Sequence, residues 1–141
     1  MSDKNAHIVA QYVRDLHAKA HIRPYENRTA LSNEITGNLT FEQLPEEGHW
    51  RTELTLTVRT LNADGVLCFE TGCTLESIAL LTGLEAQEIE PVLTHTIAAL
   101  MVGHVRSAIT NASLATGYGP TMLPPMTGAQ LESLANLSRE Q

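Results

Sequence analysis

Strict alternation of apolar and polar side chains marks residues 50–61 as a strand. Leucine and valine take every second position there, and glutamate, threonine and arginine fill the positions between. This period of two is typical of a strand with one buried face and one face in water. Residues 33–44 and 66–78 also predict strands, and Asp64-Gly65 is a strong hairpin signal, because glycine adopts the positive φ that tight turns need. We therefore expect three strands, the last two joined as a hairpin.

Apolar residues recur at every fourth position between residues 91 and 115, which predicts one long helix. Pro91 suits its first turn, where the missing N–H costs nothing. A stride of four residues runs ahead of the α-helical turn by roughly 40° at each step, so the stripe should wind around the helix. The stripe consists of Leu93, Ile97, Met101, Val105 and Ile109. Such a helix can contact its own sheet and a second partner.

Small residues form another stripe with the same spacing on this helix, at Ala99, Gly103 and Ser107. Small side chains let a neighbouring element approach closely. Two interpretations stay open: ordinary packing against the sheet of the same chain, or a surface for self-association.

The two ends of the chain are less clearly patterned. The segment 7–21 fits a helix by one apolar spacing and a strand by another, and the pattern taken alone favours a helix. After Gly117 the chain forms a connector in which Pro120, Pro124 and Pro125 prevent further helix. Thr127 can then cap a short, amphipathic final helix.

Length and charge limit the class of protein. The 141 residues match one domain, expected to span residues 1–141. The formal charge of -7 repels phosphate backbones and anionic lipids, so nucleic acid is not expected as a partner. The start has no cationic segment followed by an apolar one, and no apolar run approaches the roughly 18 residues of a membrane span. We therefore expect a cytoplasmic protein without membrane insertion.

Motifs for catalysis or cofactor binding are not found. The stretch 116–121 (TGYGPT) is no phosphate-binding loop, and no G-x-S-x-G, H-E-x-x-H or C-x-x-C motif occurs. The six histidines do not converge by spacing, so no metal site is expected. Cys68 and Cys73 lie five positions apart in one predicted strand, too far to form a disulfide, and are expected to be free, buried thiols. The chain is expected to be no enzyme and to need no cofactor.

Four motifs, in the right order over most of the chain, resemble the SecB family of bacterial export chaperones. They are QYVRDLHAKAHIRP (11–24), VLCFETGCTLESIALLTGL (66–84), GHVRSAIT (103–110) and GYGPTMLPPMTGAQLESL (117–134). The first is similar to the first strand of the family, which decides the N-terminal ambiguity in favour of a strand. The resemblance implies an α+β fold: a four-stranded antiparallel sheet with a long helix and a short C-terminal helix packed on one side. It also implies a homotetramer, a dimer of dimers, in which the small-residue stripe lies at the interface.

The resemblance further implies an ATP-independent holdase. Members of the family bind unfolded preproteins in apolar grooves and keep them export-competent for SecA, using neither nucleotide nor metal. Exposed apolar surface and flexible methionines can hold many sequences loosely. The residues expected to bind clients are Ile35, Leu39, Phe41, Met122, Leu123, Met126, Leu131 and Leu134; the alternative is that part of this set is plain core. The residues expected to bind SecA are Asp15, Leu67 and Glu70.

Two departures from the family pattern keep other functions open. Phe69 stands where the family has an acidic residue after Leu-Cys, and Lys19 stands where a second acid is expected on the first strand. A SecB-like chaperone dedicated to one partner, such as an antitoxin, would explain both departures. A small-ligand-binding α+β protein, with its pocket under the connector, is a weaker alternative from a different class.

Overall fold

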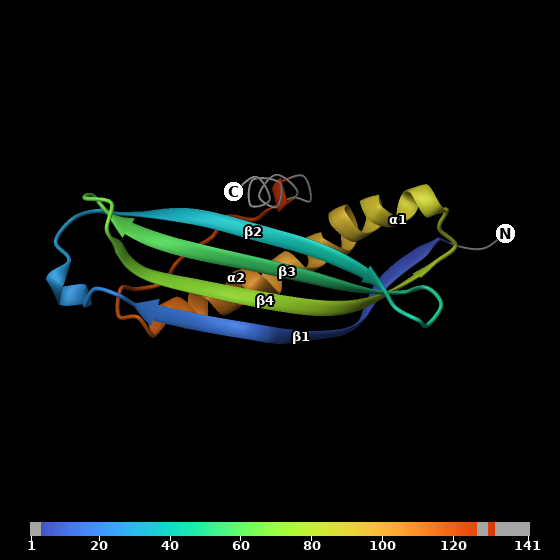
Figure 1. Ribbon diagram of the computed structural model, residues 1–141, viewed down its shortest axis with the longest axis horizontal. Helices are drawn as coiled ribbons and strands as arrows, with labels where there is room; N and C mark the ends of the chain where they lie inside the picture. The colour runs from blue at the N-terminus through green and yellow to red at the C-terminus, as the bar shows by residue number, and fades with distance from the viewer. Residues whose placement is uncertain (1–3, 127–129, 132–141) are drawn as a thin grey trace.

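Four long antiparallel strands form one twisted sheet in the computed structural model, which describes residues 4–126 and 130–131 (Figure 1). The spatial order is β1-β4-β3-β2, so β1 and β2 are the two edges. The strands are β1 (Asn5–Ala20), β2 (Leu31–Gln43), β3 (His49–Asn62) and β4 (Leu67–Thr82). All three strands predicted from the pattern are present, and each is longer than predicted.

The N-terminal segment is a strand, as the resemblance implied. It pairs with β4 from Asn5 opposite Thr82 to Ala20 opposite Phe69, with irregularities of register at Val9 and Arg14. The helix that the pattern alone favoured here is therefore wrong. Each bulge shifts the alternation of the strand by one residue, so its period of two is hidden in the sequence. The hairpin between β3 and β4 is also confirmed: Gly65 has φ 79°, and the Asn62 side chain accepts hydrogen bonds from the backbone N–H groups of Asp64 and Val66.

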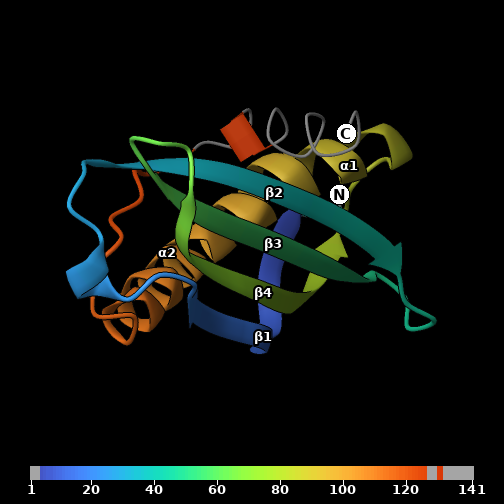
Figure 2. The ribbon, with the colours of Figure 1, turned by 60° about the vertical axis from the view of Figure 1, so that its left-hand side comes forward.

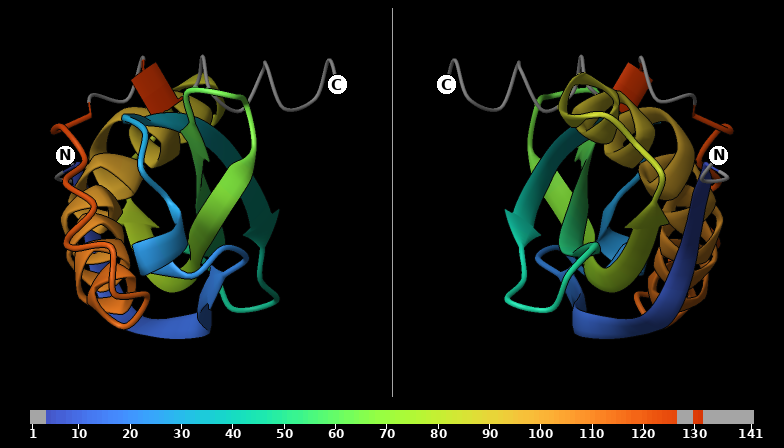
Figure 3. Two further views of the ribbon diagram at one scale, coloured as in Figure 1. Left: turned by 90° about the vertical axis from the view of Figure 1, so that its left-hand side faces the viewer. Right: turned by 90° about the vertical axis from the view of Figure 1, so that its right-hand side faces the viewer.

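The sheet has one covered face and one open face (Figures 2 and 3). One helix crosses the covered face, and alternate residues of the central strands pack beneath it. Thus Leu54, Leu56 and Val58 are buried, while the residues between them lie on the opposite face. We call the two surfaces the helix-side face and the outer face.

The helix is continuous from α1 (Ala86–Val92) through a π-helical turn, η2 (Leu93–Ile97), to α2 (Ala98–Leu114). It begins five residues before the predicted start, because Glu85 and Glu88 form a capping box that satisfies free backbone N–H groups. Pro91 therefore lies inside α1 instead of in its first turn. The whole predicted stripe is buried on the sheet. Its members are Leu93, Ile97, Met101, Val105 and Ile109.

The π turn explains why a stride of four does not carry that stripe off the sheet. The N–H of Ala98 bonds to the carbonyl of Leu93, five residues back. A π turn holds more residues than an α turn, so four residues fall short of a full turn there instead of running ahead of it. The π turn therefore offsets the rotation of the stripe around the helix that one four-residue step would otherwise cause.

By length and composition alone, the run Ala86–Leu114 could cross a membrane (29 residues, mean hydropathy 1.3). In the structure 44% of its most apolar window is buried. The core helix of a water-soluble fold passes the same test, so this is weak evidence for a membrane span.

The connector, which we define as residues 115–126, returns along α2 and passes over the helix-side face toward β2 (Figure 1). Gly117 and Gly119 have φ 83° and 96°, which end the helix and redirect the chain. Beyond the connector, Gln130 and Leu131 are helical. The remainder of the predicted final helix, including Leu134, lies outside the described residues.

Both cysteines are free and buried, as predicted. The pKa of the Cys73 thiol lies above its usual value because burial disfavours the thiolate.

Candidate functional site

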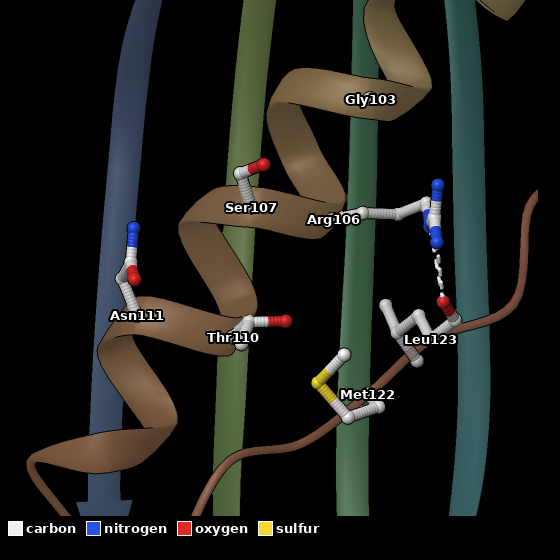
Figure 4. Close-up of a pocket in the computed structure, with 7 residues that line it drawn as sticks. All are labelled: Gly103, Arg106, Ser107, Thr110, Asn111, Met122 and Leu123. Carbon is white, nitrogen blue, oxygen red and sulfur yellow. Dashed lines mark hydrogen bonds between the residues drawn. The ribbon is translucent and has the colours of Figure 1, made fainter.

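The connector is held on α2 by three polar side chains of the helix, two of which, Arg106 and Thr110, are drawn in Figure 4. Ser113 Oγ accepts a hydrogen bond from the N–H of Thr121 at 2.7 Å, and Thr110 Oγ1 donates to the carbonyl of the same residue at 2.7 Å. Arg106 donates from Nε and Nη2 to the carbonyl of Leu123, at 3.0 and 2.9 Å. The connector therefore has a fixed path beside the helix.

The first part of the connector is anchored independently. Tyr118 stacks on Phe69 of β4, with 4.6 Å between ring centroids, and its hydroxyl donates to the carbonyl of Ile22 at 2.5 Å. Phe69 thus points to the helix side, away from the outer face. Burial raises the pKa of Tyr118, because the charged phenolate would lose hydration.

Side chains of the connector alternate between the core and the solvent. Leu123 is buried, Met126 is half-buried against the core, and Met122 is 71% exposed. Leu131 is also buried. The predicted client-binding residues of this segment are therefore brought to one place, but most of them form core in this chain.

The predicted client-binding residues of β2 lie on the same helix-side face. Leu39 is buried, and Ile35 and Phe41 are half-buried against the same apolar cluster that contains Leu123 and Leu131. The structure thus joins two segments more than 70 positions apart into one apolar layer, whose role in client binding stays a prediction.

Sequence reasoning missed the part of this layer near α1. Trp50, Ile89 and Val92 are half-buried and pack against the same core. Ile89 also lines an open cavity of about 490 Å³ at the end of the sheet, together with Leu81 and Leu84. Two signals could have found these residues: Trp50 begins the alternating strand in the buried parity, and Ile89 precedes Leu93 by the four-residue stride.

The residues predicted to bind SecA share the outer face but are spread along it. Asp15 pairs with Thr74 and Glu70 with Lys19 across the β1–β4 ladder, and Leu67 lies at the start of β4. Asp15 makes a contact of 2.8 Å with His17. The His17 ring leaves no room for a side chain at Gly72, since a Cβ there would come within 2.3 Å of it.

A buried carboxylate ties the outer face together further along. The side chain of Glu76 is 2% exposed, and Arg14 of β1 donates to it at 3.2 Å. Arg51 of β3 lies 3.2 Å from its other oxygen and also pairs with Glu42 of β2, so alternating charges cross all four strands. The pKa of Tyr12 lies above its usual value, chiefly because its hydroxyl hydrogen-bonds to the Glu76 carboxylate.

The small-residue stripe of α2 does not pack on the sheet of this chain. Gly103 and Ser107 are exposed and Ala99 is half-buried; a Cβ at Gly103 would meet nothing within 4 Å. Leu100 and Leu114, also on α2, are exposed. The first of the two interpretations of this stripe is therefore not supported for Gly103 and Ser107.

The edge strand β1 exposes apolar side chains along its length. They are Val9, Tyr12, Val13 and Leu16, each between 45% and 49% exposed. Monomeric proteins rarely leave a long edge strand both unpaired and apolar, because it invites pairing with another chain.

No metal-binding group of three or more histidine, cysteine or carboxylate side chains occurs among the described residues. His17 and His21 contact Asp15 and Glu70 instead of a common centre. Nothing in this part of the chain assembles a nucleophile with a base.

Comparisons with known proteins agree with this architecture. The family model described as SecB, preprotein translocase subunit SecB, matches residues 1–132. No curated protein matches the chain. Among solved structures, the chain is similar to the SecB-like chaperone of Mycobacterium tuberculosis in complex with a ChAD peptide from the HigA1 antitoxin. The TM-score is 0.74 at 12% identity, over 86% of this chain and 91% of that one. A protein of unknown function from Streptococcus agalactiae has a TM-score of 0.42 at 13% identity, over 86% of this chain and 98% of that one.

The match to the family model covers nearly the whole chain, and the four-stranded antiparallel sheet and the long helix are those that the resemblance implied. A chaperone role is thereby supported. The chain belongs to the SecB family.

Proposed function

We propose that this protein is an ATP-independent holdase that binds unfolded preproteins and keeps them export-competent for SecA. The observation that carries the proposal is the apolar layer in which Leu39 and Phe41 of β2 meet Leu123 and Met126 of the connector. Met122, 71% exposed beside this layer, offers a flexible apolar side chain to a client.

Loose binding at several places suits this role. A flexible methionine and half-buried apolar residues hold many sequences weakly, and a long client gains affinity by occupying several such sites on one particle. The charge of -7 favours clients with basic segments. No nucleotide, metal or catalytic group takes part in this mechanism.

The particle is proposed to be a homotetramer, a dimer of dimers. The exposed apolar residues of β1 offer an edge for a second chain, and the stripe of Ala99, Gly103 and Ser107 allows close approach of another helix. Clients would then wrap around several copies of the apolar layer. We propose a bacterial, cytoplasmic location, where preproteins are met before export.

Contact with SecA is proposed on the outer face, at Asp15, Leu67 and Glu70. Lys19 opposite Glu70 reduces the negative charge of this surface. Phe69 is turned inward onto Tyr118, so it offers no replacement for an acidic side chain there.

These two departures favour a second candidate, a SecB-like chaperone dedicated to one partner protein. The Mycobacterium tuberculosis neighbour was solved with a peptide from an antitoxin. Under this alternative the same apolar layer binds one unstable partner, which becomes soluble only when the two proteins are produced together.

The test is aggregation of a chemically unfolded preprotein diluted into buffer without ATP, with this protein added at tetramer-equivalent concentration. We expect suppressed aggregation by a tetramer, with the mass checked by light scattering. Met122→Glu should weaken suppression, because a charge replaces the exposed apolar side chain next to the layer.

Tyr25→Glu is the matched control, because Tyr25 is equally exposed (74%, against 71% for Met122) but lies in the β1–β2 connection. Equal loss in both variants would contradict the proposed client surface. No suppression by the unmodified protein would exclude a general holdase and leave the dedicated partner.

A further inference from the structure

The three side chains that hold the connector recognise only its main chain. Arg106, Thr110 and Ser113 lie on one face of α2, with spacings of four and three residues. Their partners are the N–H and C=O of Thr121 and the C=O of Leu123. These main-chain groups are the same in almost any polypeptide, so this row does not require the connector sequence.

The segment on the row has the form of an extended peptide. Thr121 and Leu123 are buried, whereas Met122 between them is exposed and borders the open cavity beside α2 (Figure 4). The Leu123 side chain enters the apolar cluster of the sheet. An extended segment of any unfolded chain could match this arrangement if it placed an apolar residue at the position of Leu123.

We propose that the row of Arg106, Thr110 and Ser113 is a main-chain binding site for extended client segments, occupied by the connector until a client displaces it. This inference rests on the proposed holdase function and names how the client is bound. The client is recognised by two kinds of chemistry: its backbone on the row, and one apolar side chain in the place of Leu123.

The attachments of the connector make such an exchange possible. Tyr118 holds its beginning through the stack on Phe69 and the bond to Ile22, so that part can stay in place. Gly119, with φ 96° and open space around it, provides a pivot between this anchor and the row. Pro120 and Pro124 have no N–H, so the connector can donate few backbone bonds that a client would have to replace.

There is also room beside the connector. A cavity of about 260 Å³ lies between α2 and the segment around Met122, bordered by Gly103 and Ser107 (Figure 4). A segment leaving or entering the row can pass through this space without displacing the helix from the sheet.

The test follows two hydrogens by NMR, the amide of Thr121 and the Nε–H of Arg106, in the full chain with and without a permanently unfolded, carboxymethylated protein. We expect client to speed exchange of the Thr121 amide about tenfold or more, because its bond to Ser113 is lost. The Arg106 Nε–H should stay protected, since a client carbonyl replaces that of Leu123.

Two outcomes would overturn the inference. Loss of protection at both hydrogens means that the connector leaves but the row binds no client, and no change at either means that clients bind elsewhere. Binding of the client is followed in the same sample by light scattering. If the client binds without these changes in exchange, the main-chain binding site is contradicted but the holdase proposal is not. No binding at all removes the holdase proposal with it.

A pair of variants gives a second measurement. Leu123→Ala weakens the binding of the connector to the row but leaves the row itself unchanged, so the affinity for clients should rise several-fold. Met122→Ala changes an exposed side chain of the connector and should not raise this affinity. If Leu123 instead served as an ordinary contact for clients, its replacement would lower the affinity. A melting temperature for each variant confirms that it is folded.

Discussion

Strands β1 and β4 are neighbours of equal length, yet their burial is opposite. Both have 16 residues and pair along nearly their whole length. No residue of β1 is fully buried, whereas most residues of β4 are. One row of paired residues across the sheet shows the change: Leu39, Leu54 and Leu75 are 4%, 1% and 2% exposed, but Val13 of β1 is 49% exposed.

The burial of a strand in this sheet thus depends on the strands and helices that lie beside it and across it. β4 has a strand on both edges and α2 across it. Side chains of β1 and β3 therefore reduce the solvent exposure even of its outer face. β1 has a neighbour on one edge, and the helix covers it only in part. Its apolar side chains are therefore left largely uncovered by the rest of this chain.

The largest expected effect is at Leu75, among the paired residues that cross the sheet. Leu75→Ala should lower the free energy of unfolding by about 2–5 kcal/mol, because it leaves a cavity among buried leucines. Val13→Ala, at the paired position on β1, should cost less than about 1 kcal/mol at low protein concentration. Urea unfolding of both variants, at several protein concentrations, measures the two costs.

The series of protein concentrations tests whether β1 is covered by a second chain. If a second chain covers β1 in the assembly, the cost of Val13→Ala grows with protein concentration, while that of Leu75→Ala does not. Equal costs at every concentration would contradict the division into a buried and an uncovered strand.

A smaller effect is expected at the charge that links the two strands. Glu76→Gln should cost roughly 1–3 kcal/mol, because the buried group loses its charge-assisted contacts with Arg14 and Arg51. Glu53→Gln is the matched control: Glu53 faces Glu76 directly across the β3–β4 ladder and should change stability by less than about 0.5 kcal/mol. Chemical unfolding of both variants decides, and a control as costly as Glu76→Gln would show that the network adds nothing specific.

The smallest effect is a titration on β1. The hydrogen bond to Glu76 raises the pKa of Tyr12, so Glu76→Gln should move this pKa back toward the usual value, about 10. A folded pKa above the unfolded one means that this contribution to stability is present below about pH 10 and is lost as the pH rises through the folded pKa. NMR of ring-labelled tyrosine follows the titration, with Tyr12→Phe to assign the signal. An unchanged pKa in Glu76→Gln would mean that another group sets it.

Much of the fold could be predicted because its signals are local. Alternation at residues 50–61 and the Asp64-Gly65 turn specify a strand and a hairpin whatever surrounds them. The start of the helix was predicted too far along the sequence, because the two glutamates of the capping box look like part of an acidic turn until the backbone geometry is known. The π turn has no such signal, since it is selected by the fit of the stripe to the sheet.

The candidate site was harder to predict than the fold. The connector and β2 could be named from the resemblance, but Trp50 and Ile89 were missed because their part in the layer depends on where the helix crosses the sheet. The bonds from Arg106, Thr110 and Ser113 to the connector were also not foreseen, because each joins a side chain to main-chain atoms that carry no sequence signal.

The periodicity of the strands and the helix, the turn that joins β3 to β4, and the resemblance to a family through four ordered motifs can all be read from the amino-acid sequence. Which apolar residues form the core and which remain exposed depends on the folded arrangement of the strands and the helix. Val13 and Leu75 are similar side chains in paired strands, and the same pattern places both on the helix-side face. Their burial differs because it depends on the neighbours that folding supplies, and β1, at the edge of the sheet, has too few of them within this chain.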